Sequence, residues 1–116
     1  MSYLEVAVSA VPAIHRARYT EVAANAAAVF MTHGARAVTE NWGVDVPKGK
    51  VTDFHRAVQC QDNEVVVVST ILWPSKDVRD KAWANLMDDP AMANHDGLLD
   101  MSRMIFGGFE EIVAQR

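Results

Sequence analysis

The chain has 116 residues, of which 50% are hydrophobic and 22% are charged, so we expect a single globular domain spanning residues 1–116. Its net charge of −4, without a run of basic residues, excludes the basic surface typical of nucleic-acid-binding proteins. No apolar run approaches the roughly 18 residues that a membrane-spanning helix needs, so we expect no membrane segment.

The N-terminal part of the chain predicts a strand and then a helix. Residues 3–11 alternate between apolar and other side chains, which indicates a half-buried strand. Pro12 suits the first turn of a helix, and Gly34 suits the left-handed position that ends one. Between them, apolar residues recur at steps of three and four and form an amphipathic stripe: Tyr19, Val22, Ala23, Ala26 and Phe30.

The middle of the chain predicts three further strands. Residues 35–46 alternate, with Val38, Glu40 and Trp42 on one face. Residues 54–60 are predicted to form a short strand between two turns, so residues 35–73 are expected to form a meander. Residues 64–73 are rich in valine and apolar at both odd and even positions. Since side chains alternate across a strand, this central strand must be buried on both faces.

The C-terminal part predicts a helix and a last strand. Ser75 is the expected helix N-cap, and residues 88–90 are expected to end this helix. The last strand lies within residues 101–113, where Gly107 and Gly108 indicate a bulge or a close approach of another group.

This order of elements predicts an α+β fold, the ferredoxin-like βαββαβ arrangement with an antiparallel sheet. Two helices cover only one face of such a sheet, yet the strand at 64–73 is apolar on both. We therefore expect a homodimer in which the sheets of two subunits pack face to face. The alternative is that a loop, such as residues 95–102, folds over the open face.

Several segments together resemble a YbaA-like bacterial family of unknown function. They are Gly49-Lys50-Val51-Thr52-Asp53-Phe54, Trp73-Pro74-Ser75-Lys76, Asp89-Pro90-Ala91-Met92 and Arg103-Met104-Ile105-Phe106-Gly107-Gly108-Phe109-Glu110. The resemblance covers residues 3–112 and implies a dimeric α+β barrel. That superfamily includes cofactor-free monooxygenases acting on quinol-like aromatics, haem-degrading enzymes, small isomerases and non-enzymes, so the resemblance implies no single reaction.

Two groups of residues are candidates for catalysis or ligand binding. Asp53 and His55, on one side of the predicted strand, would make a carboxylate–imidazole pair in which His55 serves as general base. The alternative is an exposed strand start with two solvated polar groups.

The second group centres on Glu40, a carboxylate among apolar neighbours, with Trp42 as an apolar platform for a ligand. Tyr19 and Phe30 are expected to contact the same ligand. Alternatively, Glu40 forms an ion pair with Arg36, Arg56 or Arg103, while Tyr19, Phe30 and Trp42 fill a collapsed cavity.

No metal site or cofactor is expected, because the four histidines are dispersed and no ligand spacing stands out. The single cysteine, Cys60, excludes an intramolecular disulfide and, with no recognisable signal peptide, leads us to expect a cytoplasmic protein. Two functions remain open: an enzyme of the cofactor-free oxygenase or isomerase type acting on a small aromatic or carbonyl compound, and a non-catalytic dimer that binds a metabolite or a protein.

Overall fold

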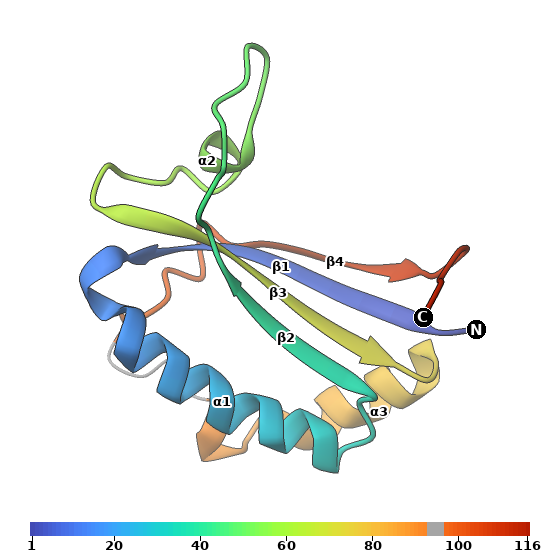
Figure 1. Ribbon diagram of the computed structural model, residues 1–116. Coiled ribbons are helices and arrows are strands. Elements are labelled where there is room, and N and C mark those ends of the chain that lie inside the picture. The colour runs from blue at the N-terminus through green and yellow to red at the C-terminus, as the bar shows by residue number, and fades with distance from the viewer. Residues whose placement is uncertain (93–96) are drawn as a thin grey trace.

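A four-stranded antiparallel sheet carries the two long helices on one of its faces in the computed structural model, which describes residues 1–92 and 97–116 (Figure 1). The strands, in the spatial order β2-β3-β1-β4, are β1 (Tyr3–Pro12), β2 (Ala37–Trp42), β3 (Glu64–Trp73) and β4 (Ile105–Glu110). The helices are η1 (Ala13–His15), α1 (Arg16–Thr32), α2 (Phe54–Ala57), α3 (Lys76–Leu86) and η2 (Pro90–Met92). The predicted ferredoxin-like α+β fold is confirmed.

The boundaries of α1 and α3 follow from local chemistry that the sequence displays. Gly34 has a φ of +104°, so it closes α1 in a conformation that a residue with a Cβ adopts only under strain. Ser75 caps α3, since its hydroxyl oxygen accepts a hydrogen bond of 3.2 Å from the backbone N–H of Val78. Both predicted helix boundaries are confirmed.

The predicted strand over residues 54–60 is wrong, because residues 54–57 form the short helix α2. Asp53 is its N-cap, and the Asp53 carboxylate accepts hydrogen bonds from the backbone N–H of Arg56 (2.7 Å) and of Gly49 (3.1 Å). These bonds lower the pKa of Asp53. They favour a helical turn over an extended strand, so the predicted geometry of Asp53 and His55 on one strand is also wrong.

The predicted meander over residues 35–73 is therefore replaced by one direct pairing. β2 ends at Trp42 instead of residue 46, and Trp42 lies opposite Val67 of β3. Residues 43–63, which we call the arm, leave the sheet between these two strands. Figure 1 shows the arm, with α2, projecting away from the side on which α1 and α3 lie.

β3 is apolar on both sides because different parts of the chain pack on each. Val67, Ile71 and Trp73 lie in the core between the sheet and the helices. On the other side, Val66 is buried in a cluster with Val58 of the arm. The arm thus covers one end of the sheet face that the helices leave free.

The remainder of that sheet face carries apolar side chains, and we call it the open face. Strand partners in an antiparallel sheet share a side, and Leu4 lies opposite both Leu72 and Phe109. Phe109 is 57% exposed and Ile105 is 45% exposed. By the same register the open face comprises Leu4, Val6, Val68, Leu72, Ile105 and Phe109.

The loop that we expected as an alternative cover lies partly outside the described residues, at 95–96. In the described part of this loop, Leu98 is buried against Val11, Tyr19 and Val67 on the helix side of the sheet. The contacts of Leu98 therefore place this part of the loop against the helix-side core and not over the open face.

Glu5 organises a polar network inside the core that the sequence did not indicate. One carboxylate oxygen of Glu5 accepts hydrogen bonds from the indole N–H groups of Trp73 (2.8 Å) and Trp83 (2.7 Å). Arg79 lies 3.6 Å from the other oxygen and donates a 2.8 Å hydrogen bond to the hydroxyl of Tyr3. Buried indoles need an acceptor, and one strand residue supplies it to two helix-side tryptophans.

One of the two glycines of β4, Gly108, is explained by the close approach of a side chain. The strand pairing runs on through them, with Val6 opposite Gly107 and Glu5 opposite Gly108, which is not the bulge that we considered. A Cβ at Gly108 would collide with the phenol ring of Tyr3. Gly108 therefore leaves room for the Tyr3–Arg79 pair.

None of the described helices combines the length and apolar character required to cross a membrane.

Candidate functional site

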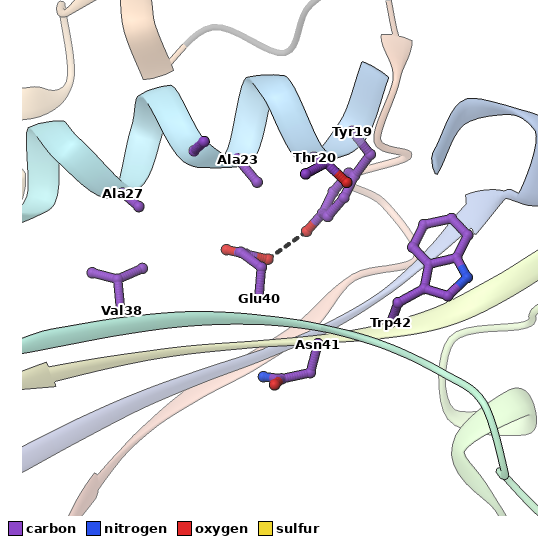
Figure 2. A pocket seen from close by; sticks show the side chains of 9 residues that line it. Tyr19, Thr20, Ala23, Ala27, Val38, Glu40, Asn41 and Trp42 are labelled. Carbon is purple, nitrogen blue, oxygen red and sulfur yellow. Dashed lines mark hydrogen bonds between the residues drawn. The ribbon is translucent and has the colours of Figure 1, made fainter. Parts of the chain in front are cut away.

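A cleft between α1 and the edge strand β2 brings together three of the predicted site residues (Figure 2). It has a volume of about 230 Å³ and opens to solvent at the sheet edge. Figure 2 shows Tyr19 from α1 and Glu40 and Trp42 from β2 pointing into it, whereas the side chain of Asn41 points to the other side of the strand. Alternation along β2 thus turns every second side chain of this strand into the cleft.

Small side chains on α1 leave the space that forms the cleft. Ala23 and Ala27 lie one and two helical turns after Tyr19, and both face β2. The alanine-rich sequence of α1 therefore does more than allow close packing on the sheet. It keeps the cleft open beside Glu40.

Glu40 is held by two hydroxyl groups that come from different elements. Its Oε1 accepts a 2.6 Å hydrogen bond from Tyr19 and another of 2.6 Å from Ser69 of β3. Burial, and then the hydrogen bond to Glu40, raise the pKa of Tyr19, so its hydroxyl keeps its proton and remains a donor. In the part of the chain that the structure describes, Oε2 of Glu40 accepts no hydrogen bond and is available to a ligand.

Aromatic side chains line one end of the cleft, and a cationic group packs on one of them. The rings of Tyr19 and Trp42 lie 6.3 Å apart and are inclined by 50°. The guanidinium of Arg16 lies over the Trp42 ring, 5.4 Å from its centroid, which is within the range of a cation–π interaction. Trp42 therefore contacts two residues of α1.

The other predicted site residues lie elsewhere. Phe30 packs edge-on against Trp73 (6.2 Å) and Trp83 (5.3 Å) in the core, which places it outside the cleft. Asp53 and His55 are in the arm, on the opposite side of the sheet from α1. The six predicted residues therefore do not form a single site.

The predicted alternative of an ion pair at Glu40 is not what the described residues show. Arg36 donates to the hydroxyl of Ser2, Arg56 lies 3.7 Å from Asp53, and Arg103 binds Glu64. Two residues that contact side chains of the cleft, Ser69 at Glu40 and Arg16 at Trp42, were missed by the sequence analysis. Ser69 had a signal in the sequence, since it interrupts the apolar run of β3, and the structure places it directly opposite Glu40.

A second, smaller cavity of about 170 Å³ lies at the base of the arm and is lined in part by His55 and Glu64. The Nδ1 atom of His55 is buried and has no hydrogen-bond partner among residues 1–92 and 97–116.

Glu64 is bound through both oxygens by Arg103, at 2.7 and 2.8 Å, and this hydrogen bonding lowers the pKa of Glu64 below its ordinary value of 4.5. Nearby, burial and the Glu64 charge raise the pKa of Cys60, which favours the unreactive thiol.

The Glu64–Arg103 pair predicts a pH dependence of stability. Because the pKa of Glu64 is lower in the folded state, its contribution is fully present above pH 4.5 and is lost as the pH falls through the folded-state value. We expect Glu64→Gln to lower the free energy of unfolding at pH 7 and to lose this deficit at lower pH. Urea unfolding of both proteins between pH 7 and pH 3 measures it. A constant difference across this range would contradict the prediction.

The described residues contain no group of three or more histidine, cysteine, aspartate or glutamate side chains that could hold a metal ion. The chemistry that the cleft itself offers is that of a carboxylate beside an aromatic platform. Glu40 can accept a hydrogen bond or a proton from a bound molecule, and Trp42 can stack on a planar one.

Comparison with known sequences shows which family the chain belongs to. Residues 2–108 match the model of a family described as protein of unknown function DUF1428, and the chain is a member of this family. It is 48% identical to the uncharacterized protein YbaA of Escherichia coli strain K12 over 115 residues, which are 97% of this chain and 98% of that protein. The resemblance found in the sequence is confirmed.

Solved structures show the same fold at low sequence identity. SnoaB, a cofactor-independent oxygenase from Streptomyces nogalater, is 19% identical with a TM-score of 0.59, over 97% of this chain and 95% of that one. A nipsnap family protein with unknown function from Agrobacterium tumefaciens is 16% identical with a TM-score of 0.53, over 93% and 86%. These likenesses agree with the predicted α+β fold, and at such identities they show the fold alone.

Proposed function

We propose that this protein is a homodimeric enzyme that binds a small aromatic or carbonyl compound in the α1/β2 cleft and uses Glu40 as a general base. The observation that carries the proposal is the asymmetric environment of the Glu40 carboxylate. Its Oε1 is fixed by Tyr19 and Ser69, while its Oε2 accepts no hydrogen bond from the described residues and faces the cleft. A base needs such a fixed orientation and one free lone pair.

Removal of a proton is the first step of both reaction types that we considered. An isomerase takes a proton from carbon next to a carbonyl group and returns it elsewhere. A cofactor-free oxygenase needs an electron-rich substrate anion that can react with O₂. The likeness of fold to the oxygenase SnoaB supports the second type only as an analogy.

Exchange of substrate hydrogen for deuterium tests the shared step without knowledge of the product. Candidate phenols, quinols and ketones are incubated with the protein in D₂O and followed by NMR. For a compound that binds, we expect enzyme-dependent incorporation of deuterium at an acidic C–H position. Glu40→Gln keeps the hydrogen-bonded shape but removes the base, so we expect the exchange rate to fall by about 10²–10⁴-fold.

Glu21→Gln is the matched control, since it removes a carboxylate from an exposed position on α1. We expect its exchange rate to equal that of the wild type. Exchange that survives in Glu40→Gln, with the ligand still bound, would contradict the role of Glu40 as base.

The homodimer is the second part of the proposal, and the open face supports it. Six apolar side chains on three strands would remain at least partly accessible to water in a single subunit, among them Phe109 at 57% exposure. Contiguous exposed apolar surface of this kind marks an interaction site, and a second sheet of the same chain is complementary to it by symmetry.

A non-catalytic ligand-binding dimer is the alternative. The small volume of the cleft supports it, because this alternative was expected to have a partly collapsed cavity. Ligand pockets commonly enclose about 300–1,000 Å³, and the volume here is about 230 Å³. A compound that binds with a measurable affinity but shows no proton exchange and no O₂ consumption would select this alternative.

A further inference from the structure

The wall of the α1/β2 cleft changes in chemical character along β2, and this change determines which kind of molecule the cleft can accept. Figure 2 shows three positions in a row: Trp42 at one end, Glu40 in the middle and Val38 at the other end. Trp42 carries the Arg16 guanidinium on its ring, whereas Val38 faces Ala27. A cation, a hydrogen-bond acceptor and an apolar wall therefore follow one another.

Arg16 is placed to reach a ligand in this cleft. It precedes Tyr19 and Thr20 by three and four residues, and both of these residues line the cleft, so Arg16 lies on the same side of α1. Its side chain packs on Trp42, another residue of the cleft wall. Among the described residues no carboxylate or carbonyl group accepts a hydrogen bond from its guanidinium. The donors of Arg16 are thus held over an aromatic platform without an acceptor among residues 1–92 and 97–116.

We propose that the molecules bound in this cleft are aromatic carboxylic acids, with the carboxylate at Arg16, the ring against Trp42 and a hydroxyl group at Glu40. This inference rests on the proposed ligand site and specifies its ligand class. Arg16 is then a specificity-determining residue, because a guanidinium binds a carboxylate through two parallel hydrogen bonds.

The spacing of the cleft fits a ring substituted at opposite ends. Trp42, over whose ring the Arg16 guanidinium lies, and Glu40 are two residues apart on one face of a strand, which separates their Cα atoms by about 7 Å. A benzene ring with a carboxylate at one end and a hydroxyl group at the other has a comparable length. Glu40 repels a second carboxylate at its own position, so it accepts a neutral hydroxyl group there and selects the orientation of the ligand.

Isothermal titration calorimetry with 4-hydroxybenzoate and 4-hydroxybenzamide tests the inference, because these probes share shape and differ in charge. We expect the acid to bind about tenfold or more tightly than the amide, since a charge-assisted bidentate contact is lost in the amide. Arg16→Gln is expected to weaken binding of the acid by the same factor and to change the affinity for the amide by no more than about twofold. Arg18→Gln removes the same charge from the same helix, about 200° around its axis, and is expected to keep the preference.

The outcomes separate this inference from the proposed function. Equal binding of acid and amide, or a preference that survives in Arg16→Gln, would overturn the acid specificity while leaving the cleft as a ligand site. If neither probe binds, the acid specificity is also overturned. The proposed function then fails only if no compound of the phenol, quinol and ketone panel binds to the cleft.

Discussion

Phe109→Asp is expected to convert the protein from a dimer into a monomer. Phe109 lies on the open face opposite Leu4, and a dimer through this face would bury it against the partner sheet. A carboxylate without a partner costs several kcal/mol when it is taken out of water. We therefore expect the dissociation constant of the dimer to rise by about 100-fold or more. Sedimentation equilibrium at micromolar concentrations measures this change.

Phe106→Asp is a closely matched control for this experiment. Phe106 is in the same strand and is 79% exposed, but it lies opposite Ala7 and so points to the other side of the sheet. Its replacement is expected to leave the dimer intact. A monomeric wild type, or an equal effect of both substitutions, would contradict dimerisation through the open face.

Glu5→Ala is expected to cause the largest loss of stability among single substitutions of charged residues. It removes the acceptor of two indole N–H groups, those of Trp73 and Trp83, and Trp73 is fully buried. Arg79 also loses one of its two carboxylate neighbours and keeps the other, Asp80, at 2.8 Å. Donors left without partners cost about 1–3 kcal/mol each, so we expect a loss of about 3–5 kcal/mol.

Urea unfolding at a fixed protein concentration measures this loss, since a dimer's stability depends on concentration. Glu5→Gln keeps an acceptor oxygen for both indoles and is expected to recover more than half of the loss. Glu21→Ala, at an exposed position on α1, is expected to change the free energy of unfolding by less than about 0.5 kcal/mol. An unfolding curve of Glu5→Ala that matches the wild type would disprove the role of the network.

Most of the fold could be predicted from the sequence because several local signals agree. The double-sided apolar pattern of residues 64–73, the cap at Ser75 and the closing glycine at position 34 each match the observed elements. The arm is where the prediction failed. Apolar alternation around Phe54 resembles a strand, but the hydrogen bonds from Arg56 and Gly49 to the Asp53 carboxylate close a helical turn instead.

Only some of the residues expected to share one site lie together in the cleft, and the reason is geometric. Tyr19 and Phe30 share one stripe of α1, but they are eleven residues and hence about 16 Å apart along the helix. The stripe therefore spans two separate clusters, one beside Val67 and one beside Trp73. Periodicity identifies the buried side of a helix, whereas the crossing of that helix over the sheet decides which of its residues meet Glu40.

The role of Glu5 could not be read from the sequence, because its partners are distant along the chain. Trp73 and Trp83 belong to β3 and α3, and both converge on one carboxylate of β1. The general requirement that a buried indole has an acceptor was visible, but it does not identify which acidic residue meets it.

The central claim is that the α1/β2 cleft binds a small aromatic molecule, and NMR mapping tests it most directly. Titration of ¹⁵N-labelled protein with 4-hydroxybenzoate, and then with the panel of phenols, quinols and ketones, follows the three indole resonances, which substitution of each tryptophan by phenylalanine assigns. We expect the Trp42 indole and the backbone amides of Tyr19, Ala23 and Glu40 to shift, while the indoles of Trp73 and Trp83 do not. Shifts confined to the open face or the arm, or no shift with any compound, would contradict the account.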